Sequence, residues 1–391
     1  MKILVVSFYY QPDLCAGSFR CTALIQQLAL LHTDIEVITT VPNRYASFKP
    51  YAASFEHQDN VRVHRILLPS HNSGMIDQIK AFITYYRKTQ ELVEKQDYDM
   101  VYATSSRLFT AFLGARIAKT KGLPLYLDIR DIFADTMKDI LPNSITWLTK
   151  PILSFIEKYT FGCAKRINLV SKGFSSYFRK RYHDATYRFF TNGIDKEFVS
   201  AAPQGYIKCS AKSIVTVLYA GNLGQGQGLD KIIPELAERL NGKVHFKIIG
   251  DGGQKREFED AVKHRGLENV ELLPPVSRND LVEEYQKADV LFLHLNDYPA
   301  FEKVLPSKLF EYAAMGKPIW AGLSGFSSDF IKLEIINCEV FAPANVDDAI
   351  IKFDSLNLDV TPRTEFIKKF SRENIMRNMA LDIVEFSKDN A

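Results

Sequence analysis

The chain is poor in cysteine, and its cysteines form no pattern that builds a structural site. The five of them are Cys15, Cys21, Cys163, Cys209 and Cys338. No two are spaced as CxxC, and their odd number and scattered positions argue against a disulfide framework or a zinc site. These features fit a reducing compartment.

Long apolar runs are missing too. No stretch of 18 consecutive apolar residues occurs, which excludes an ordinary transmembrane helix. The apolar start, Lys2–Tyr10, is too short for a signal peptide and leads into Gln11-Pro12-Asp13 rather than a small-residue cleavage site. We expect it to form a buried first strand.

Several nucleotide and metal motifs are also absent. No GxGxxG follows the first strand, which counts against a nicotinamide-binding protein, and no GK[ST] completes a Walker A motif. No His, Cys and carboxylate residues show the spacing of metal ligands. Asp97-Tyr98-Asp99 reads DxD, but it precedes a predicted strand. We interpret it as a loop, since ligands bind at the opposite end of parallel strands.

The charge is unevenly distributed over the 391 residues, a length that suggests two domains. Residues 1–194 hold 25 Lys and Arg against 16 Asp and Glu, whereas residues 195–391 hold 24 against 30. The basic half either faces an anionic membrane, nucleic acid or a phosphorylated substrate, or owes its charge to ordinary solvated surfaces. Because no nucleic-acid-binding motif accompanies the basic residues, we expect no nucleic acid partner.

Short apolar runs alternate with helical patterns along the whole chain. The predicted strands are Ile3–Phe8, Ile35–Thr39, Val61–Ile66, Met100–Ala103, Pro124–Asp128, Ile167–Val170, Val215–Ala220, His245–Ile249, Val270–Leu273, Val290–Leu293, Pro318–Ala321 and Cys338–Phe341. The predicted helices are Ser18–Leu31, Met75–Lys95, Phe109–Lys121, Pro151–Cys163, Leu229–Leu240, Lys255–Arg265, Arg278–Lys287, Lys308–Met315 and Asp347–Leu356. This alternation indicates two doubly wound α/β domains with parallel sheets, joined near residues 190–213.

Residues that follow strands are the site candidates, because ligands of open α/β sheets bind beyond the carboxyl ends of the strands. Gly17 follows the first strand and permits close backbone approach at a helix start, where Ser18 reads equally as a plain N-cap. A buried strand ends with Asp128, Arg130 and Asp131. These three charges indicate either a functional site or a structural salt bridge.

The second half carries a glycine-rich loop after its first strand. Gly221, Gly224, Gly226 and Gly228 fall within eight residues and precede a helix. The N–H groups of such a loop can cradle phosphates. Gly250 lies in a second strand-to-helix turn, which on its own is an ordinary turn.

The segment Leu305–Ile319 is the most informative. Pro306 and Ser307 predict a helix start, and Lys308 and Glu311 share one face of the first turn. A lysine is unfavourable there with the helix dipole, which indicates a bound anion. A surface ion pair between the two side chains is the alternative.

In combination these motifs resemble the GT-B retaining glycosyltransferases of family 4 over nearly the whole chain. The matching segments are the loop at Gly17, Thr191–Asp195, Gly221–Gly228, Gly250–Gly252 and Pro306–Pro318. Asp128–Asp131 and Pro306–Tyr312 are similar to the bacterial O-antigen and capsule branch, which includes transferases of N-acetylfucosamine.

The resemblance implies two Rossmann-like domains that face a central cleft. Residues 1–190 would hold the acceptor and residues 191–369 the nucleotide sugar, with a C-terminal helix at about residues 370–391 that returns to the first domain. It also implies a retaining enzyme without metal or other cofactor. The enzyme would move an N-acetylated amino or deoxyamino sugar from a UDP-sugar to a polyprenyl-diphosphate-linked acceptor in surface polysaccharide biosynthesis.

The sequence departs from this family pattern near the donor. Lys303 stands where many members have the first Glu of an EX7E pattern, Asn222 and Gln227 stand where many have Arg and Lys, and Arg130 replaces a strand-end His. Since a leaving diphosphate gains charge in the transition state, other cations should stabilise it. We expect Lys308 to do so first.

The resemblance and these departures assign roles to the candidates. Glu311 accepts hydrogen bonds from the ribose, as the second Glu of the family does. Asp128 or Asp131 orients Arg130 or takes the proton of the acceptor. The predicted catalytic residues are Lys308, Arg130, Asp131 and Asp128, and the predicted donor-binding residues are Gly17, Arg20, Asn192, Gly221, Asn222, Gln227, Gly228, Gly250, Ser307 and Glu311.

Two segments suggest a membrane-facing surface. Residues 133–150 lead into an apolar stripe at helical spacing, made of Ile145, Leu148, Ile152, Phe155, Ile156 and Tyr159, and residues 174–182 interleave aromatic and basic side chains. Such segments lie in a bilayer interface or face the domain core. With the basic excess, we expect a cytoplasmic protein attached peripherally to the inner face of the cell membrane.

Two other classes stay open. A nonhydrolysing UDP-sugar 2-epimerase shares the fold but needs carboxylates that move the C2 proton. An inactive scaffold subunit of a polysaccharide assembly complex needs no phosphate site, so affinity for UDP separates it from the enzymes. The sequence leaves the oligomeric state undefined.

Overall fold

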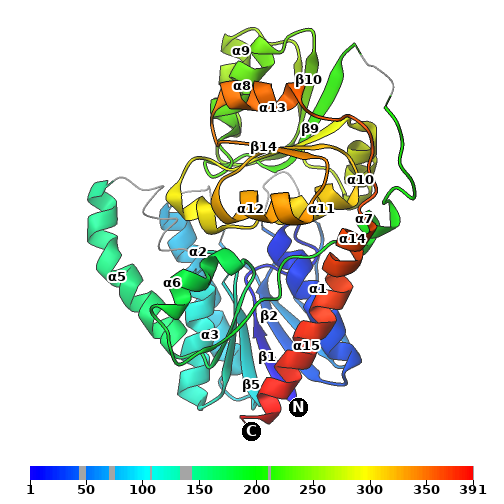
Figure 1. Cartoon of the computed structure of the whole chain (residues 1–391). Coiled ribbons are helices and arrows are strands. Elements are labelled where there is room, and N and C mark those ends of the chain that lie inside the picture. The colour runs from blue at the N-terminus through cyan, green and yellow to red at the C-terminus, as the bar shows by residue number, and fades with distance from the viewer. Residues whose placement is uncertain (44–49, 70–74, 106–107, 133–142, 210–212, 391) are drawn as a thin grey trace. The chain divides into compact units, whose positions relative to one another are not determined.

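The computed structural model describes residues 1–43, 50–69, 75–105, 108–132, 143–209 and 213–390. The chain forms two compact units (Figure 1), of which unit 1 is Met1–Asn192 with Glu373–Ala391 and unit 2 is Gly193–Arg372. Both are α/β units built on largely parallel sheets, which confirms the predicted fold class of two Rossmann-like domains. Unit 1 is assembled from two separate stretches of the chain.

Unit 1 has an eight-stranded sheet, counted over the described residues, in the order β3-β4-β2-β1-β5-β6-β7-β8. The strands are β1 (Lys2–Val6), β2 (Asp34–Thr40), β3 (Phe55–Gln58), β4 (Val61–Ile66), β5 (Met100–Thr104), β6 (Leu125–Ile129), β7 (Arg166–Leu169) and β8 (Thr186–Arg188). All neighbours pair in parallel except β3, which runs antiparallel to β4. Our sequence analysis missed β3 and β8, the two edge strands.

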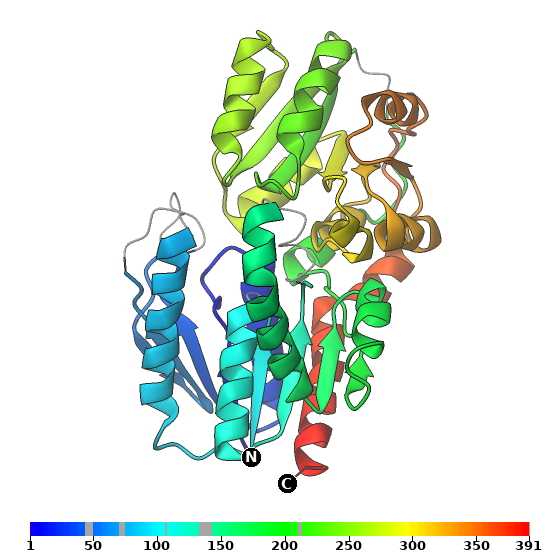
Figure 2. The same cartoon turned by 90° about the vertical axis from the view of Figure 1, so that its left-hand side faces the viewer.

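Helices cover both faces of this sheet. The helices α1 (Ala16–Leu30) and α15 (Arg372–Lys388) share one face, where Leu24 and Ile25 meet Met379 and Ile383 in a single core. The helices α2 (Met75–Val93), α3 (Leu108–Lys121) and α5 (Asn143–Gly162) lie on the other face (Figure 2). Two short helices, η1 (Lys172–Phe174) and α6 (Ser175–Arg179), follow β7. The core of unit 1 therefore depends on α15 from the far end of the chain.

Unit 2 has a six-stranded parallel sheet, again over the described residues, in the order β11-β10-β9-β12-β13-β14. The strands are β9 (Val215–Asn222), β10 (Val244–Asp251), β11 (Val270–Leu273), β12 (Val290–His294), β13 (Ile319–Gly322) and β14 (Cys338–Phe341). All six match predicted strands.

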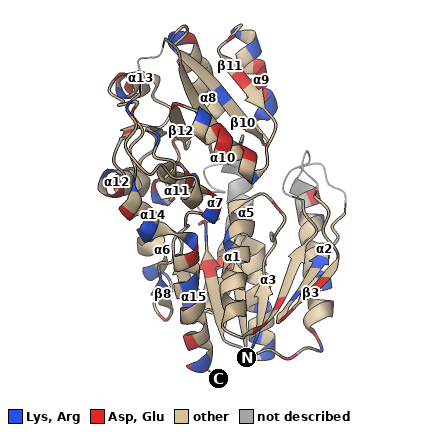
Figure 3. Cartoon of the chain, turned by 90° about the vertical axis from the view of Figure 1, so that its right-hand side faces the viewer, with Lys and Arg blue, Asp and Glu red and all other residues tan. Residues whose placement is uncertain are grey.

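The helices of unit 2 surround this sheet. They are α7 (Lys196–Ser200), α8 (Leu229–Arg239), α9 (Lys255–His264), α10 (Arg278–Lys287), η2 (Pro299–Lys303), α11 (Lys308–Ala314), α12 (Gly325–Glu334), α13 (Val346–Asp354) and α14 (Thr364–Phe370). Trp320 is fully buried in the core, where its ring centroid lies 5.1 Å from that of Phe292. Acidic residues are visible on α9 and α10 in Figure 3, in keeping with the negative balance of this half.

The strand order of each unit reverses beside the first strand of that unit. In unit 1, β1 lies between β2 and β5, and in unit 2, β9 lies between β10 and β12. The Gly221–Gly228 loop, Asp251 and His294 therefore lie together where the neighbouring strands β9, β10 and β12 end, at the carboxyl end of the unit 2 sheet. Such a reversal is where open α/β sheets bind their ligands.

The two candidate membrane segments have different structures. Residues 133–142 lie outside the described residues, but on α5 the side chains of Ile152 and Phe155 are 61% and 69% exposed, so they do not belong to the core. In the second segment Phe174 and Phe178 are buried, which makes its aromatic part core rather than interface. Among the described residues, no helix is both long and apolar enough to cross a membrane.

Candidate functional site

The Gly221–Gly228 loop is held tightly at the sheet edge of unit 2. A Cβ atom added at Gly250 would lie 1.9 Å from the carbonyl oxygen of Gly221, so only glycine at 250 lets β10 approach the loop. At the other end of the loop, Gly228 has φ +58 and precedes the first residue of α8. The loop thus ends with its backbone turning into the N-terminus of an 11-residue helix, which favours an anion there.

The polar side chains of the loop bond to each other. Asn222 Nδ2 donates to Gln227 Oε1 over 2.8 Å, which fixes the two side chains across the turn. We predicted both to donate to phosphate or sugar. In this structure one N–H of the Asn222 amide and the Oε1 of Gln227 are used in this bond within the loop.

Lys308 lies against the first residue of this loop. A Cβ atom at Gly221 would come within 2.1 Å of Lys308 Cε and 2.4 Å of Nζ, so the lysine side chain occupies the space over Gly221. Lys308 is the first residue of α11, and Ser307 is its N-cap without a capping hydrogen bond from its side chain. The structure therefore brings together Lys308, Gly221 and Gly250, which we predicted from three separate segments.

Glu311 is buried one turn further along α11, with 7% of its surface exposed. Its Oε1 accepts from Arg278 Nη1 at 2.9 Å, and its Oε2 accepts from Tyr285 Oη at 3.3 Å. The surface pair between Lys308 and Glu311 that we weighed as an alternative does not describe this carboxylate. Arg278 was missed because it lies 33 positions away in sequence, and its place directly after the N-cap Ser277 was the only local hint.

His294, at the end of β12, bonds to the backbone of the Gly221–Gly228 loop. Our sequence analysis did not identify this residue. Its Nδ1 lies 2.6 Å from the carbonyl oxygen of Gln227, and its Nε2 accepts from the backbone N–H of Ala344 at 3.0 Å. This pairing requires the proton on Nδ1 and a neutral ring. Burial lowers the pKa of His294 to about 4.

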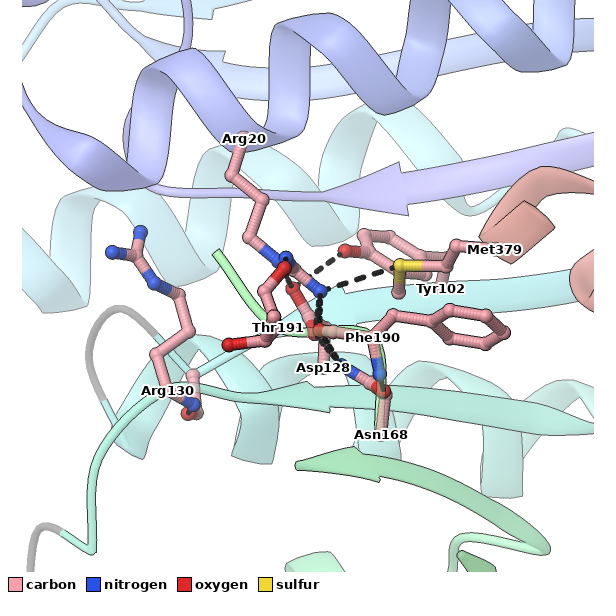
Figure 4. A network of polar contacts seen from close by, with 9 residues as sticks. Arg20, Tyr102, Asp128, Arg130, Asn168, Phe190, Thr191 and Met379 are labelled. Carbon is pink, nitrogen blue, oxygen red and sulfur yellow. Dashed lines mark hydrogen bonds and ion pairs between the residues drawn. The ribbon is translucent and has the colours of Figure 1, made fainter. Parts of the chain in front are cut away.

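Arg20, one of the predicted donor-binding residues, forms a buried ion pair inside unit 1. Arg20 is 1% exposed and binds Asp128 through Nε at 2.7 Å and Nη2 at 3.0 Å (Figure 4). Its Nη1 and Nη2 also donate to the carbonyl oxygens of Thr191 and Phe190, each at 2.7 Å. The guanidinium of Arg20 is thus bonded within unit 1, and its assignment to donor binding stays a prediction.

The same network corrects the prediction for Asp128. This carboxylate also accepts from Asn168 Nδ2 at 2.7 Å and from Tyr102 Oη at 3.1 Å. Burial alone would raise the pKa of Asp128, but the charge and hydrogen bonds of Arg20 and the amide of Asn168 lower it. A saturated carboxylate that favours its charged form is a poor proton acceptor, and it pairs with Arg20 rather than orienting Arg130.

The remaining candidates of unit 1 lie around this network. Arg130 points away from Asp128 in Figure 4, and its Nε has no hydrogen-bond partner among the described residues. Asp131 is exposed. Gly17 is buried inside α1, whose N-cap is Cys15, so Ser18 is not a cap. Asn192 is 4% exposed, and its Oδ1 has no partner in the described part of the chain.

No group of three or more His, Cys, Asp or Glu side chains converges as a metal site within the described ranges. The DxD sequence precedes β5, as we interpreted it. There Asp99 Oδ2 accepts from the backbone N–H of Lys2 at 2.6 Å.

The chain is similar in sequence to known glycosyltransferases. Residues 211–372 match the family model of group 1 glycosyl transferases. The match covers most of unit 2, which is similar to this family. The putative colanic acid biosynthesis glycosyl transferase WcaI of Escherichia coli K12 is 38% identical over 101 residues, which are 26% of this chain and 24% of the relative. The match thus spans about a quarter of that protein.

Solved glycosyltransferase structures are similar in fold to this chain. Sucrose-phosphate synthase from Thermosynechococcus elongatus superposes with TM-score 0.75 at 13% identity over 99% of both chains. WaaG, involved in lipopolysaccharide biosynthesis, gives 0.65 at 15% identity over 97% of this chain and 95% of its own. Anabaena Alr3699/HepE in complex with UDP gives 0.64 at 15% identity over 98% and 100%. At these identities the likeness establishes the GT-B fold.

Proposed function

We propose that the chain is a retaining, metal-independent glycosyltransferase of surface polysaccharide biosynthesis. The observation that carries the proposal is the packing of Lys308 against Gly221 within the segment that matches the group 1 family model. It puts a cation on a phosphate-type glycine loop at the point where the sheet reverses its strand order. WcaI and WaaG, to which the chain is similar, are named for colanic acid and lipopolysaccharide biosynthesis.

In the proposed reaction, the bond between the anomeric carbon and the diphosphate oxygen breaks while Lys308 and the loop amides bind the departing charge. The acceptor hydroxyl oxygen then bonds to the anomeric carbon on the face that the diphosphate leaves, which retains the configuration. Of the two predicted carboxylates, Asp131 is left to take the proton of the acceptor, since Asp128 is committed to Arg20. Glu311 accepts hydrogen bonds from the ribose.

For the donor we propose a UDP-sugar, with an N-acetylated amino or deoxyamino sugar as in the N-acetylfucosaminyltransferase-like branch. HepE, a neighbour in fold, was solved in complex with UDP. For the acceptor we propose a polyprenyl-diphosphate-linked saccharide. The exposed Ile152 and Phe155 on α5, together with the basic excess of residues 1–194, support peripheral attachment to the inner face of the cell membrane.

Isothermal titration of the purified protein with UDP, GDP and dTDP, with and without EDTA, tests the proposal. We expect UDP to bind equally well in EDTA. Preference for GDP or dTDP would overturn the donor and keep the fold. If none of the three nucleotides binds, the transferase proposal fails and an inactive scaffold subunit becomes the better description.

A further inference from the structure

Arg278 is surrounded by three carboxylates of unit 2. Its Nη1 lies 2.9 Å from Glu311 Oε1 and its Nε 3.1 Å from Glu197 Oε1, while its Nη2 forms an ion pair with Asp195. The side chain is 16% exposed, and that of Glu311 is 9% exposed. The guanidinium fork thus joins the start of α10 to α11 and to α7.

A second arginine and an aromatic ring complete the cluster. Arg372 also forms an ion pair with Asp195, and its Nη2 lies 3.2 Å from Asp195 Oδ2. The Arg278 guanidinium carbon lies 4.6 Å from the centre of the Phe198 ring. A guanidinium over an aromatic ring that also forms three directed ion pairs suits arginine, and a lysine ammonium cannot form the three pairs in this geometry.

The cluster sets the position of Glu311. Burial alone would lower the pKa of Arg278, but the carboxylates of Glu311, Asp195 and Glu197 raise it, so the guanidinium stays charged. A nearly buried carboxylate that loses its cation protonates or turns towards water, because an unpaired buried charge is costly. Among the described residues, Oε2 of Glu311 is held by the 3.3 Å contact with Tyr285.

We propose that Arg278 is a positioning residue that holds the Glu311 carboxylate in the orientation in which it accepts from the ribose hydroxyls of the donor nucleotide. This inference rests on the proposed function. The bond to Arg278 occupies Oε1 and leaves lone pairs of both oxygens for the ribose. Arg278 contacts Glu311, whereas Lys308 packs over Gly221, so Arg278 acts on the ribose end of the donor and Lys308 on the diphosphate end.

The test compares UDP with 2′-deoxy-UDP by titration calorimetry in the wild type, Arg278→Met, Arg278→Lys and Glu311→Gln. We expect the wild type to prefer UDP about tenfold or more, which is the size of one lost charged hydrogen bond. Arg278→Met should reduce this ratio to near one, while its affinity for 2′-deoxy-UDP stays within about threefold of wild type. Arg278→Lys keeps the charge without the fork and should restore only part of the ratio.

Other outcomes overturn the inference. An equal loss of affinity for both nucleotides in Arg278→Met means a merely structural role, and an unchanged ratio means that Arg278 does not position Glu311. If Arg278→Met does not fold, the test uses the ratio of UDP to 2′-deoxy-UDP affinity in Arg278→Lys. A ratio equal to that of the wild type then overturns the inference. Equal wild-type affinity for both nucleotides refutes the contact of Glu311 with the ribose, and with it this inference, but leaves the proposed transferase activity intact, whereas no binding of either nucleotide refutes that activity. Arg239→Met, which breaks an exposed 2.7 Å pair with Asp347, is the matched control.

Discussion

His294 should make the stability of unit 2 fall in mild acid. The ring is fully buried and must stay neutral to donate to Gln227 and accept from Ala344. Its pKa is about 4 in the folded chain against 6.5 for an ordinary histidine, so the unfolded chain binds the extra proton first. The stabilisation is complete above pH 6.5 and is lost as the pH falls towards 4. At 1.36 kcal/mol per pKa unit, it amounts to about 3 kcal/mol.

The assay is urea unfolding followed by tryptophan fluorescence. The chain has two tryptophans, so Trp147→Phe leaves Trp320, which is buried in the core of unit 2, as the reporter. Its neighbour Phe292 stacks on the His294 ring, with centroids 6.2 Å apart. We would measure the free energy of unfolding between pH 7.5 and about 4.5.

The comparison variant is His294→Phe in the same background. It leaves the Gln227 carbonyl and the Ala344 N–H without their partner, which costs about 1–3 kcal/mol for each group at neutral pH. It should also lose the acid-dependent part, so the difference from wild type shrinks as the pH falls. A difference that stays constant from pH 7.5 to 4.5 would refute the reasoning.

Three further predictions concern the loop, the lysine and the surface. Lys308→Ala should lower kcat by about 10²–10³ with a smaller change in donor KM, since the charge acts on the departing diphosphate, and Lys352→Ala, which removes a half-exposed pair with Glu339, should be neutral. Gly221→Ala should displace the Lys308 side chain, weaken UDP binding and lower the melting temperature, because φ at Gly221 is +155, which a residue with a Cβ atom rarely adopts. Gly250→Ala meets backbone 1.9 Å away and should unfold unit 2, so equal melting temperatures for the two variants would contradict the packing argument. Phe155→Glu should abolish cosedimentation with anionic vesicles at unchanged UDP affinity, and persistent sedimentation would exclude α5 as the contact.

The sequence predicted the strands that are buried and short of charge, because their apolar runs stand out between helical patterns. It missed β3, whose residues Phe55–Gln58 include Glu56 and His57, since an edge strand needs no apolar run. Helices α12 and α14 were missed too. The glycine loop and the Lys308 segment could be found because each is continuous in sequence.

The contacts between distant positions could not be predicted. Arg20 and Asp128 are 108 positions apart, and charge at a strand end fits a ligand site and a buried pair equally well. Only the fold shows that the two side chains meet. His294 and Gln227 are 67 positions apart, and a lone histidine at the end of an apolar strand gives no hint that it supports a loop.

The discontinuity of unit 1 has a consequence for the order in which the protein is made. Unit 2 is complete once Arg372 has left the ribosome, whereas unit 1 still lacks α15 at that moment. Until α15 is synthesised, the apolar surface of unit 1 against which Met379 and Ile383 pack stays exposed to solvent. A nascent chain with such a surface is prone to aggregate or to recruit chaperones. The half that is synthesised first is therefore the half that matures last.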